Sequence, residues 1–128
     1  MRFLRMFLNK GKLDGRRVMK QGSVERMLAN QMGPLKFEKM VTAAPPITAD
    51  FDPFPGTTKT HSFGFMRNEV DIPGRRRAGS QSWAGVLNTH YWFDIKSNLA
   101  GIIMTQTLPF VEPPLMAAYE EFEKAAYA

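Results

Sequence analysis

Serine and histidine are the side chains that could carry out nucleophilic catalysis here, because the 128-residue chain contains no cysteine. A serine nucleophile needs a base to activate it, and His61 and His90 are the only two histidines. The Gly-x-Ser-x-Gly elbow that presents a nucleophilic serine in many hydrolases is absent. Composition alone leaves a Ser-His-Asp triad open, since its members need not be close in sequence, but no motif supports one.

The histidines do not predict a metal site either. His90 alternates with Trp92 and Asp94 along one run of residues, which indicates a cross-strand packing position rather than a ligand. Two histidines and scattered carboxylates make a poor ligand set, and the lack of cysteine excludes disulfides and cysteine-based zinc sites. We therefore expect no metal and no cofactor.

The stretch from Arg75 to Gln106 organises the elements around these residues. Aromatic and β-branched residues fill two runs, 89–95 and 99–106, on either side of the polar turn 96–98, and this pattern predicts a β-hairpin. The run before it is rich in Gly and Ser and ends in Trp83-Ala84-Gly85. Small residues inside a strand mark places where a backbone or a ligand comes close. We expect three successive antiparallel strands, the first with an unusual edge.

The length of the chain suits one domain with a hydrophobic core, and 44% of its residues are hydrophobic. We expect short helices over residues 1–33, an irregular loop over 34–60 and an antiparallel sheet over 61–107. Residues 112–127 should form a C-terminal helix, because proline is tolerated in a first turn. The long loop is typical either of a cover over a functional cleft or of a plain surface excursion.

Three local patterns give more specific expectations. Ser23 is a good N-cap for a helix over residues 24–30. Residues 61–66 predict a strand with Phe63 and Phe65 on one face. The last helix has an apolar stripe expected to face the core, made of Leu115, Ala118, Tyr119, Phe122 and Ala126. Four charged residues of this helix are expected to face water, namely Glu120, Glu121, Glu123 and Lys124.

The net charge of +5 comes from basic residues in separate places along the chain. No recognition-helix or RNA-binding motif accompanies them, so we interpret them as solvated surface charge and expect no nucleic-acid partner. No stretch approaches the ~20 apolar residues of a membrane span, and the N-terminus lacks the features of a signal peptide. We expect a soluble, cytoplasmic chain with no membrane partner.

Several short motifs occur in an order that resembles a known family. They share their spacing along the chain: Arg2-Phe3-Leu4-Arg5-Met6, Gly15-Arg16-Arg17-Val18-Met19, Gly79-Ser80-x-x-Trp83-x-Gly85, Tyr91-Trp92-Phe93-Asp94, Gly101-Ile102-Ile103-Met104-Thr105-Gln106 and the closing helix. Together they resemble the C-terminal part of the serine β-lactamase-related family, and most closely its esterase-like members related to class C β-lactamases. The first helix lies deep inside a longer chain in that family, so we expect this chain to begin part-way through the family's domain.

The resemblance implies an α+β fold with an antiparallel sheet of about four strands and a C-terminal helix packed on it. In the family the base is the lysine of Ser-x-x-Lys, helped by a tyrosine on a separate loop. No serine of this chain has that spacing, and no Tyr-x-Asn element is present. The third element of the family's site is present, because Trp83-Ala84-Gly85 stands where lactamases have Lys-Thr-Gly and esterase-like relatives often have His-x-Gly or Trp-x-Gly.

This third element implies roles for four residues. Trp83, Ala84 and Gly85 would bind the substrate, and the amide of Val86 could point at a developing oxyanion. Trp83 in place of a cation removes a carboxylate-binding charge, which favours neutral ester-like substrates over lactams. On residue chemistry alone, Trp83 as a packed aromatic and Gly85 as a strand bulge are the alternative.

Two hypotheses for function follow. The chain is the C-terminal segment of a β-lactamase-related serine hydrolase or esterase, inactive alone and acting on a small ester or amide when complemented, or it is a non-catalytic binding or assembly module. In the resembled fold, the strand matching Gly101 to Thr107 pairs on one side with a strand that this chain lacks. We therefore expect this apolar edge to pair with a second copy or a complementing N-terminal half. The alternative is that the segment around Val18 folds back over it.

Overall fold

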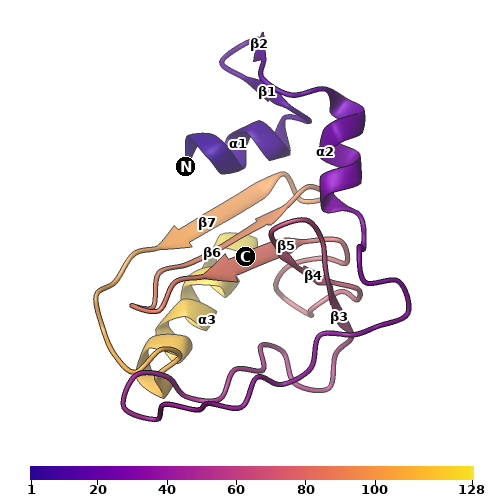
Figure 1. The fold of residues 1–128 in the computed structure, drawn as a ribbon. Coiled ribbons are helices and arrows are strands. Elements are labelled where there is room, and N and C mark those ends of the chain that lie inside the picture. The colour runs from indigo at the N-terminus through magenta and orange to yellow at the C-terminus, as the bar shows by residue number, and fades with distance from the viewer.

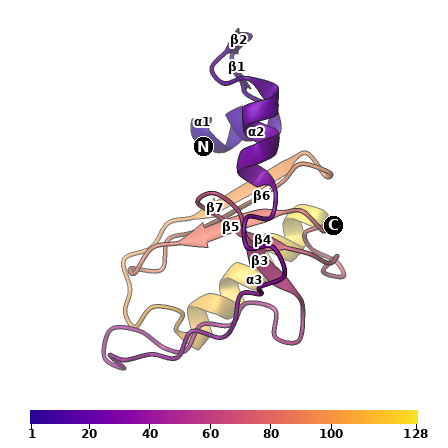
Figure 2. The same ribbon diagram turned by 45° about the vertical axis from the view of Figure 1, so that its right-hand side comes forward.

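The computed structural model describes all residues from 1 to 128, which form a five-stranded antiparallel sheet, a separate two-stranded sheet and three helices (Figure 1). In chain order the elements are α1 (Arg2–Leu8), β1 (Lys12–Leu13), β2 (Arg16–Arg17), α2 (Gln21–Leu28), β3 (Lys59–His61), β4 (Met66–Asn68), β5 (Gln81–Ala84), β6 (His90–Asp94), β7 (Leu99–Ile103) and α3 (Pro113–Tyr127). One face of the larger sheet carries α1 and α2, and the other carries α3 (Figures 1 and 2). None of the three helices has the length and apolar character that crossing a membrane requires.

The three strands expected between Arg75 and Gln106 are confirmed as β5, β6 and β7. They pair antiparallel in sequence order, with Trp83 opposite Tyr91 and Trp92 opposite Gly101. Asn98 closes the second hairpin with a left-handed backbone φ of 52°, which asparagine tolerates better than most residues. β7 ends at Ile103, earlier than the expected Thr107, and the Met104 side chain is 80% exposed. The apolar run of β7 is therefore not buried on both faces throughout its length.

The α+β class is confirmed, and the sheet has one strand more than expected. The single strand predicted over residues 61–66 is wrong, because these residues turn the chain between β3 and β4, with His61 paired to Met66. Gly64 has a φ of 92° at the reversal. Phe65 is buried, whereas Phe63, which was expected on the same face, is exposed. The β3–β4 hairpin extends the sheet beyond β5, giving the order β3-β4-β5-β6-β7.

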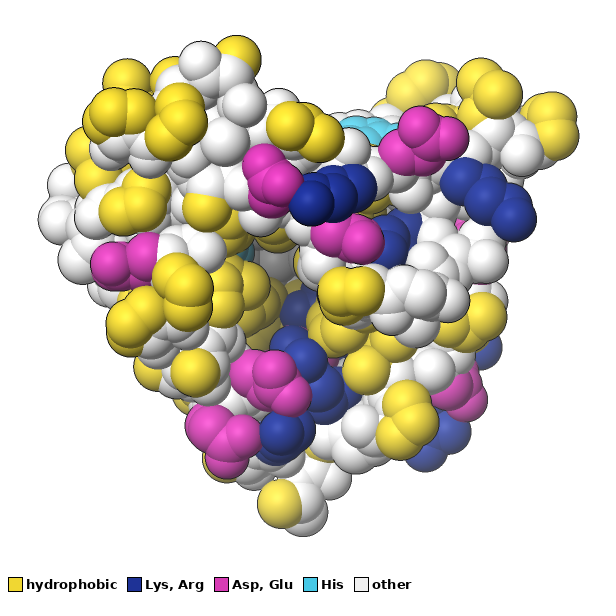
Figure 3. Space-filling view, turned by 90° about the horizontal axis from the view of Figure 1, so that it is seen from below, with side chains coloured by type: hydrophobic (Ala, Val, Ile, Leu, Met, Phe, Trp, Pro, Cys, Tyr) yellow, Lys and Arg dark blue, Asp and Glu magenta, His cyan; other side chains and the backbone are white.

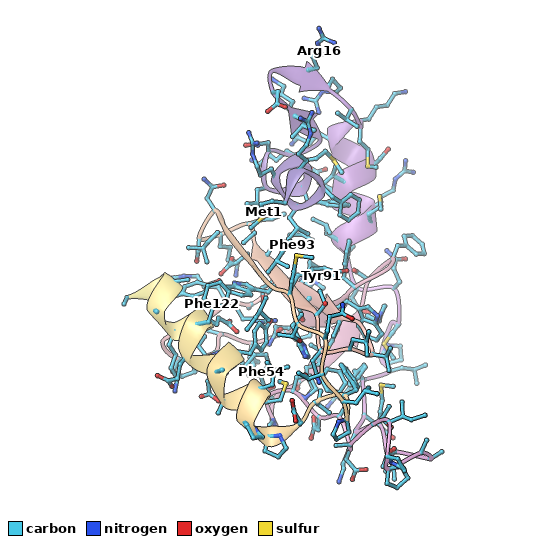
Figure 4. All side chains as sticks on the ribbon, turned by 90° about the vertical axis from the view of Figure 1, so that its left-hand side faces the viewer. Met1, Arg16, Phe54, Tyr91, Phe93 and Phe122 are labelled. Atoms are coloured by element: carbon cyan, nitrogen blue, oxygen red, sulfur yellow. The ribbon has the colours of Figure 1, made fainter.

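Aromatic rings form the core on the α1 side of the sheet. Phe7 of α1 stacks on Phe93 of β6 with ring centroids 5.4 Å apart, and Phe65 meets both rings edge-on at 5.4 and 5.1 Å. Phe7 and Phe93 have no exposed surface. Tyr91 and Phe93 lie on this side of the sheet in Figure 4. Each such aromatic pair contributes about 0.5–1.5 kcal/mol beyond its buried area, which explains why α1 stays on this face.

Trp92 forms the core on the α3 side. Its ring is fully buried and meets Tyr119 and Phe122 of α3 edge-on, at 5.7 and 5.5 Å (Figure 4 labels Phe122). Across the strand pair it lies on Gly101, where an added Cβ would come within 2.0 Å of the indole. A close approach of this kind requires glycine, so the small residue in β7 is explained by its aromatic partner in β6.

A buried ionic cluster fixes α3 to the loop before β5. Glu123 was expected to face water, but its side chain has no exposed surface and accepts hydrogen bonds from Arg75 and Arg76. Arg76 is buried as well and also donates to the Tyr119 hydroxyl at 2.9 Å. The helix periodicity correctly placed Tyr119 inside, and the error at Glu123 arises because a buried carboxylate needs arginine partners from a distant segment.

The N-terminal segment departs from expectation in two places. The second helix begins at Gln21 with Lys20 as its N-cap, so the Ser23 cap is wrong, and Val24 is its buried residue. The segment around Val18 does not cover β7, because β1 and β2 pair only with each other and Val18 is 62% exposed. Within the chain, β7 is thus an edge strand with a partner on one side only.

The long loop between α2 and β3, residues 29–58, contains no helix or strand, and β3 takes up Lys59 and Thr60, which were expected to belong to the loop. Two isolated bridges hold it, one between Met40 and Phe51 and one between Thr48 and Phe110. The second bridge attaches the loop to the segment that leads into α3 (Figure 1).

Candidate functional site

The candidate substrate-binding residues lie where β5 turns into β6. Trp83 and Ala84 end β5, and Gly85 to Asn88 form a β-turn in which the Asn88 N–H donates to the Gly85 carbonyl at 2.9 Å. The Gly85 N–H points toward β6 and donates to the Thr89 carbonyl at 2.8 Å. Val86 is the first central residue of the turn, and its side chain is half exposed.

The Val86 N–H donates to no acceptor in the chain. The N–H of the first central residue of a β-turn has no partner within the turn, so an unbonded Val86 N–H does not by itself indicate a binding site. Its neighbourhood distinguishes it, since Gly85 is exposed and only one atom comes as near as 4.0 Å to its missing Cβ. A flat molecule could therefore approach the backbone here without meeting a side chain of the turn's first residue.

The edge of β5 beside the turn is open. β4 pairs with β5 only at Gln81 and Ser82, so Trp83 and Ala84 have a strand partner only on the β6 side. Backbone N–H and C=O groups alternate in direction along an antiparallel strand. The N–H of Gly85 points toward β6. The N–H and C=O of Ala84 therefore point away from β6, to the side where β4 no longer pairs with β5. This arrangement leaves backbone groups available to an extended ligand.

Trp83 lies on the α1 side of the sheet and packs against His61. The two rings meet edge-on with centroids 5.2 Å apart, and 37% of the Trp83 surface remains exposed. The His61 Nδ1 is 2.8 Å from the Ser62 carbonyl, which can only accept, so Nδ1 is the donor of this hydrogen bond. Trp83 is thus packed against another ring on one side, as in the alternative interpretation of this residue as a packed aromatic, but it is not buried.

Asn88 positions the turn, and the sequence analysis missed it. The residue is fully buried with a φ of 63°. Its Nδ2 donates to the Thr107 and Pro109 carbonyls at 3.1 and 2.9 Å, and its Oδ1 accepts from the Val111 N–H at 2.6 Å. The available signal was an asparagine between a hydrophobic turn and a strand, because asparagine tolerates the left-handed conformation and bonds to nearby backbone.

A cavity of about 410 Å³ lies beside this edge, between the sheet, α3 and the long loop. β5 contributes Ser82, Trp83 and Ala84 to its wall, and His90 of β6 continues it. The other walls are the loop residues from Asp50 to Phe54 and the first half of α3. Figure 3 looks into a hollow on the underside of the molecule, bordered by both hydrophobic and basic side chains. The long loop therefore borders a cavity and is more than a surface excursion.

His90 in the cavity wall, and Glu123, which pairs with the two arginines of the wall, have shifted pKa values. Burial, and secondarily the charge of Arg76, lower the pKa of His90 to about 4, so its ring is neutral at pH 7. This ring stacks between Phe110 and Tyr119, which confirms His90 as a packing residue. Burial alone would raise the pKa of Glu123, but hydrogen bonds and charge from Arg76 and Arg75 hold it below its ordinary value.

The chain itself offers no assembled nucleophile. No serine hydroxyl hydrogen-bonds to a lysine amine or a histidine ring; the Ser62 hydroxyl donates to Gln81 and the Ser97 hydroxyl to Asp94. No group of three or more His, Asp or Glu side chains is placed to hold a metal ion. The arrangement can present backbone donors and a cavity to a ligand.

A scan of protein-family models and a search of curated proteins each gave no match. Among solved structures, the chain is similar to unliganded simvastatin synthase from Aspergillus terreus, with 20% identity over 98% of this chain and 32% of that one, and a TM-score of 0.75. The LovD6 mutant of that enzyme matches with the same identity and coverage and a TM-score of 0.74. A penicillin-binding protein homolog from Caulobacter crescentus matches 92% of this chain and 29% of that one, at 16% identity and a TM-score of 0.57.

These likenesses show the fold of the chain. It resembles the C-terminal portion of the β-lactamase/transpeptidase-like fold, as the sequence motifs implied. The chain spans about a third of the length of the proteins it matches.

The geometry of Asn88 predicts a measurable loss of stability. Replacing Asn88 with alanine leaves the buried Val111 N–H without a partner and removes the hydrogen bonds that Nδ2 donates to Thr107 and Pro109. Asn98→Ala is the matched control, because Asn98 also has a positive φ but is exposed and makes no side-chain hydrogen bond. In urea unfolding, Asn88→Ala should lose at least about 2 kcal/mol more than Asn98→Ala. Equal losses would show that backbone strain, rather than the hydrogen bonds, is what asparagine relieves.

Proposed function

We propose that the chain is the C-terminal, substrate-facing segment of a β-lactamase-related serine hydrolase or esterase. The observation that carries the proposal is the unbonded Val86 amide beside exposed Gly85, at the open end of β5. The fold likeness to simvastatin synthase and to a penicillin-binding protein homolog supports it. The motif order places Trp83-Ala84-Gly85 where the resembled family has its third catalytic element.

In this proposal the chain contributes binding and electrostatics rather than a nucleophile. An ester or amide carbonyl would lie along the β5 edge, with its oxygen near the Val86 N–H. During attack by a serine from a separate segment, negative charge would develop on that oxygen, and the backbone donor would stabilise it. Because the turn is anchored by Asn88, the donor is held in place before the reaction.

The composition of the edge favours a neutral substrate. Trp83 stands where a lactamase would have a cation, and no lysine or arginine follows it before β6. The exposed part of the indole and the half-exposed Val86 side chain offer apolar contact to an acyl or alcohol group. We therefore infer a small ester, or an amide without a required carboxylate, as the substrate.

A second candidate function is assembly without catalysis, and the β7 edge favours it. On β6, the Thr89 carbonyl accepts a hydrogen bond from Gly85 and so points toward β5. Because peptide groups alternate in direction along a strand, those of His90 and Trp92 point to β7. Their partners in register, Gly101 and Ile103, point back to β6. The amides of Ala100 and Ile102 consequently face the open side, where no strand of the chain lies.

The proposed function predicts that the chain alone has no serine-hydrolase activity. Incubation with a p-nitrophenyl ester and a fluorophosphonate probe should give neither turnover nor labelling, because no serine has a base beside it. Stoichiometric labelling of Ser80 or Ser82 with matching turnover would contradict this. When a complementing segment with Ser-x-x-Lys restores activity, Val86→Pro should lower kcat by about 10²–10³, since proline has no N–H to donate.

Two features make this substitution a clean test. Proline is favoured at the first central position of common β-turns, so Val86→Pro should leave the turn intact. Val86→Ala removes the same side chain but keeps the N–H, and it should retain most of the activity. Full activity in a folded Val86→Pro complex would rule out the backbone role, whereas equal losses in both variants would assign the effect to the side chain.

The assembly proposal predicts which amides respond to a partner. Pairing of β7 with a second copy or with a complementing segment should slow hydrogen exchange at Ala100 and Ile102 as concentration or partner is raised. Leu99, Gly101 and Ile103 should be protected in every state, because they bond to β6, and they serve as the internal reference. A chain that stays monomeric by light scattering at all concentrations, with free exchange at Ala100 and Ile102, would refute the assembly argument.

A further inference from the structure

We propose that the cavity between β5, the long loop and α3 is a binding site for a small apolar carboxylate, such as an aryl or short-chain alkyl acid. The site would hold the apolar body of the ligand against the loop and α3, with the carboxylate on the Arg75 and Arg76 guanidinium groups. This inference concerns ligand binding by the chain alone and does not depend on acyl transfer at the β5 edge.

The size and walls of the cavity suit a small organic molecule. Its volume of about 410 Å³ lies within the ~300–1,000 Å³ typical of small-molecule sites. Most of its wall is apolar or aromatic, with contributions from the loop, the sheet and the helix: Phe51, Phe54, Met66, Val111, Met116 and Ala117. A fully charged or strongly hydrated ligand would leave this surface unmatched, so the ligand should carry an apolar body.

The two arginines form a polar end on an aromatic base. Their guanidinium carbons lie 4.5 Å (Arg75) and 4.9 Å (Arg76) from the centre of the Phe54 ring. Figure 4 shows Phe54 beside the first half of α3, where the loop meets the helix. Stacking on this ring and the hydrogen bonds to Glu123 hold both cations in fixed positions.

At the arginine end of the cavity, the positive charge exceeds the buried negative charge that faces it. Three acidic residues in the lining each contact a lysine: Asp50 contacts Lys39 at 2.6 Å, Asp52 contacts Lys59 at 2.8 Å, and Glu120 contacts Lys124 at 2.9 Å. Lys124 also contacts the exposed Glu121 at 3.0 Å. This leaves Arg75 and Arg76 against one buried carboxylate, Glu123. His90 adds no charge, because its ring is neutral at pH 7. The two guanidinium groups thus exceed the one buried carboxylate between them by one positive charge, and the carboxylate that balances it is exposed, on α3.

The guanidinium groups also have N–H donors to spare. Nη1 of Arg76 makes no hydrogen bond, and Nε of Arg75 is buried without a partner. Nη1 of Arg75 lies 3.8 Å from Glu120, too far for a hydrogen bond. Nε of Arg75 has almost no accessible surface, so Nη1 of Arg76 is the unpaired donor from which an anion in the cavity would accept. One excess charge with spare donors fits one carboxylate, which planar guanidinium groups bind well.

The test is a calorimetric titration of the full 128-residue chain with 4-phenylbutyrate at pH 7. 4-Phenylbutanamide is the matched neutral probe, because it has the same apolar body without the charge. We expect one carboxylate bound per chain and an affinity for the amide that is weaker by about tenfold or more. No binding at millimolar carboxylate, or equal affinity for the two probes, would overturn the proposal.

Three variants locate the site on the molecule. Ala117→Phe should fill the cavity and abolish binding, while Ala118→Phe, the next residue on α3, is exposed, lies outside the lining and should bind as the parent does. Arg75→Gln keeps the buried Arg76–Glu123 pair and should lose the preference for carboxylate over amide while still binding the amide. Equal binding by the two alanine variants, or an unchanged preference in Arg75→Gln, would place any bound carboxylate elsewhere and refute the site.

Discussion

The structure depends on the two adjacent residues of β6 whose side chains bury opposite faces of the sheet. Trp92 and Phe93 both have no exposed surface, and they point to α3 and to α1 respectively. Phe93 needs Phe7 of the first helix, and Trp92 needs both the missing side chain at Gly101 and the rings of α3. Because both layers meet at this strand, β6 fixes β5 on one side and β7 on the other, and thereby decides which backbone edges remain open.

The hydrogen bonds of two buried polar residues, Asn88 and Glu123, then fix segments that the aromatic core does not position. Asn88 connects the β5–β6 turn to the segment that follows β7, and Glu123 connects α3 to the arginines before β5. Both residues are buried, so each must satisfy its hydrogen bonds with groups distant in sequence. The hydrogen bonds of Asn88 position the Val86 amide, and those of Glu123 position the basic wall of the cavity. The candidate edge and the proposed carboxylate site are therefore supported by separate contacts.

Much of the sheet could be predicted, because its signals are local. The run that became β6 is rich in aromatic residues, the run that became β7 is aliphatic, and a turn containing Asn98 separates them, so the hairpin can be predicted from adjacent residues alone. The strand predicted from His61 to Met66 was wrong, because Phe63 and Phe65 alternate as they would in a strand whereas Gly64 between them turns the chain. The burial of Glu123 and the cavity could not be predicted, since both form only when segments some 50 residues apart meet. The roles of Trp83, Ala84, Gly85 and Val86 remain predictions of motif order, although their backbone geometry is compatible with them.

The end of β5 presents a free backbone donor on an anchored turn, and residue-resolved hydrogen exchange by NMR tests this property. Gly85 and Val86 are neighbours with similar exposure, so solvent access does not separate them. The Gly85 amide bonds to Thr89 and should exchange slowly, at a rate set by opening of the β5–β6 pair. The Val86 amide should exchange near the rate of an unprotected peptide. Strong protection of Val86, or rapid exchange of Gly85, would contradict the account.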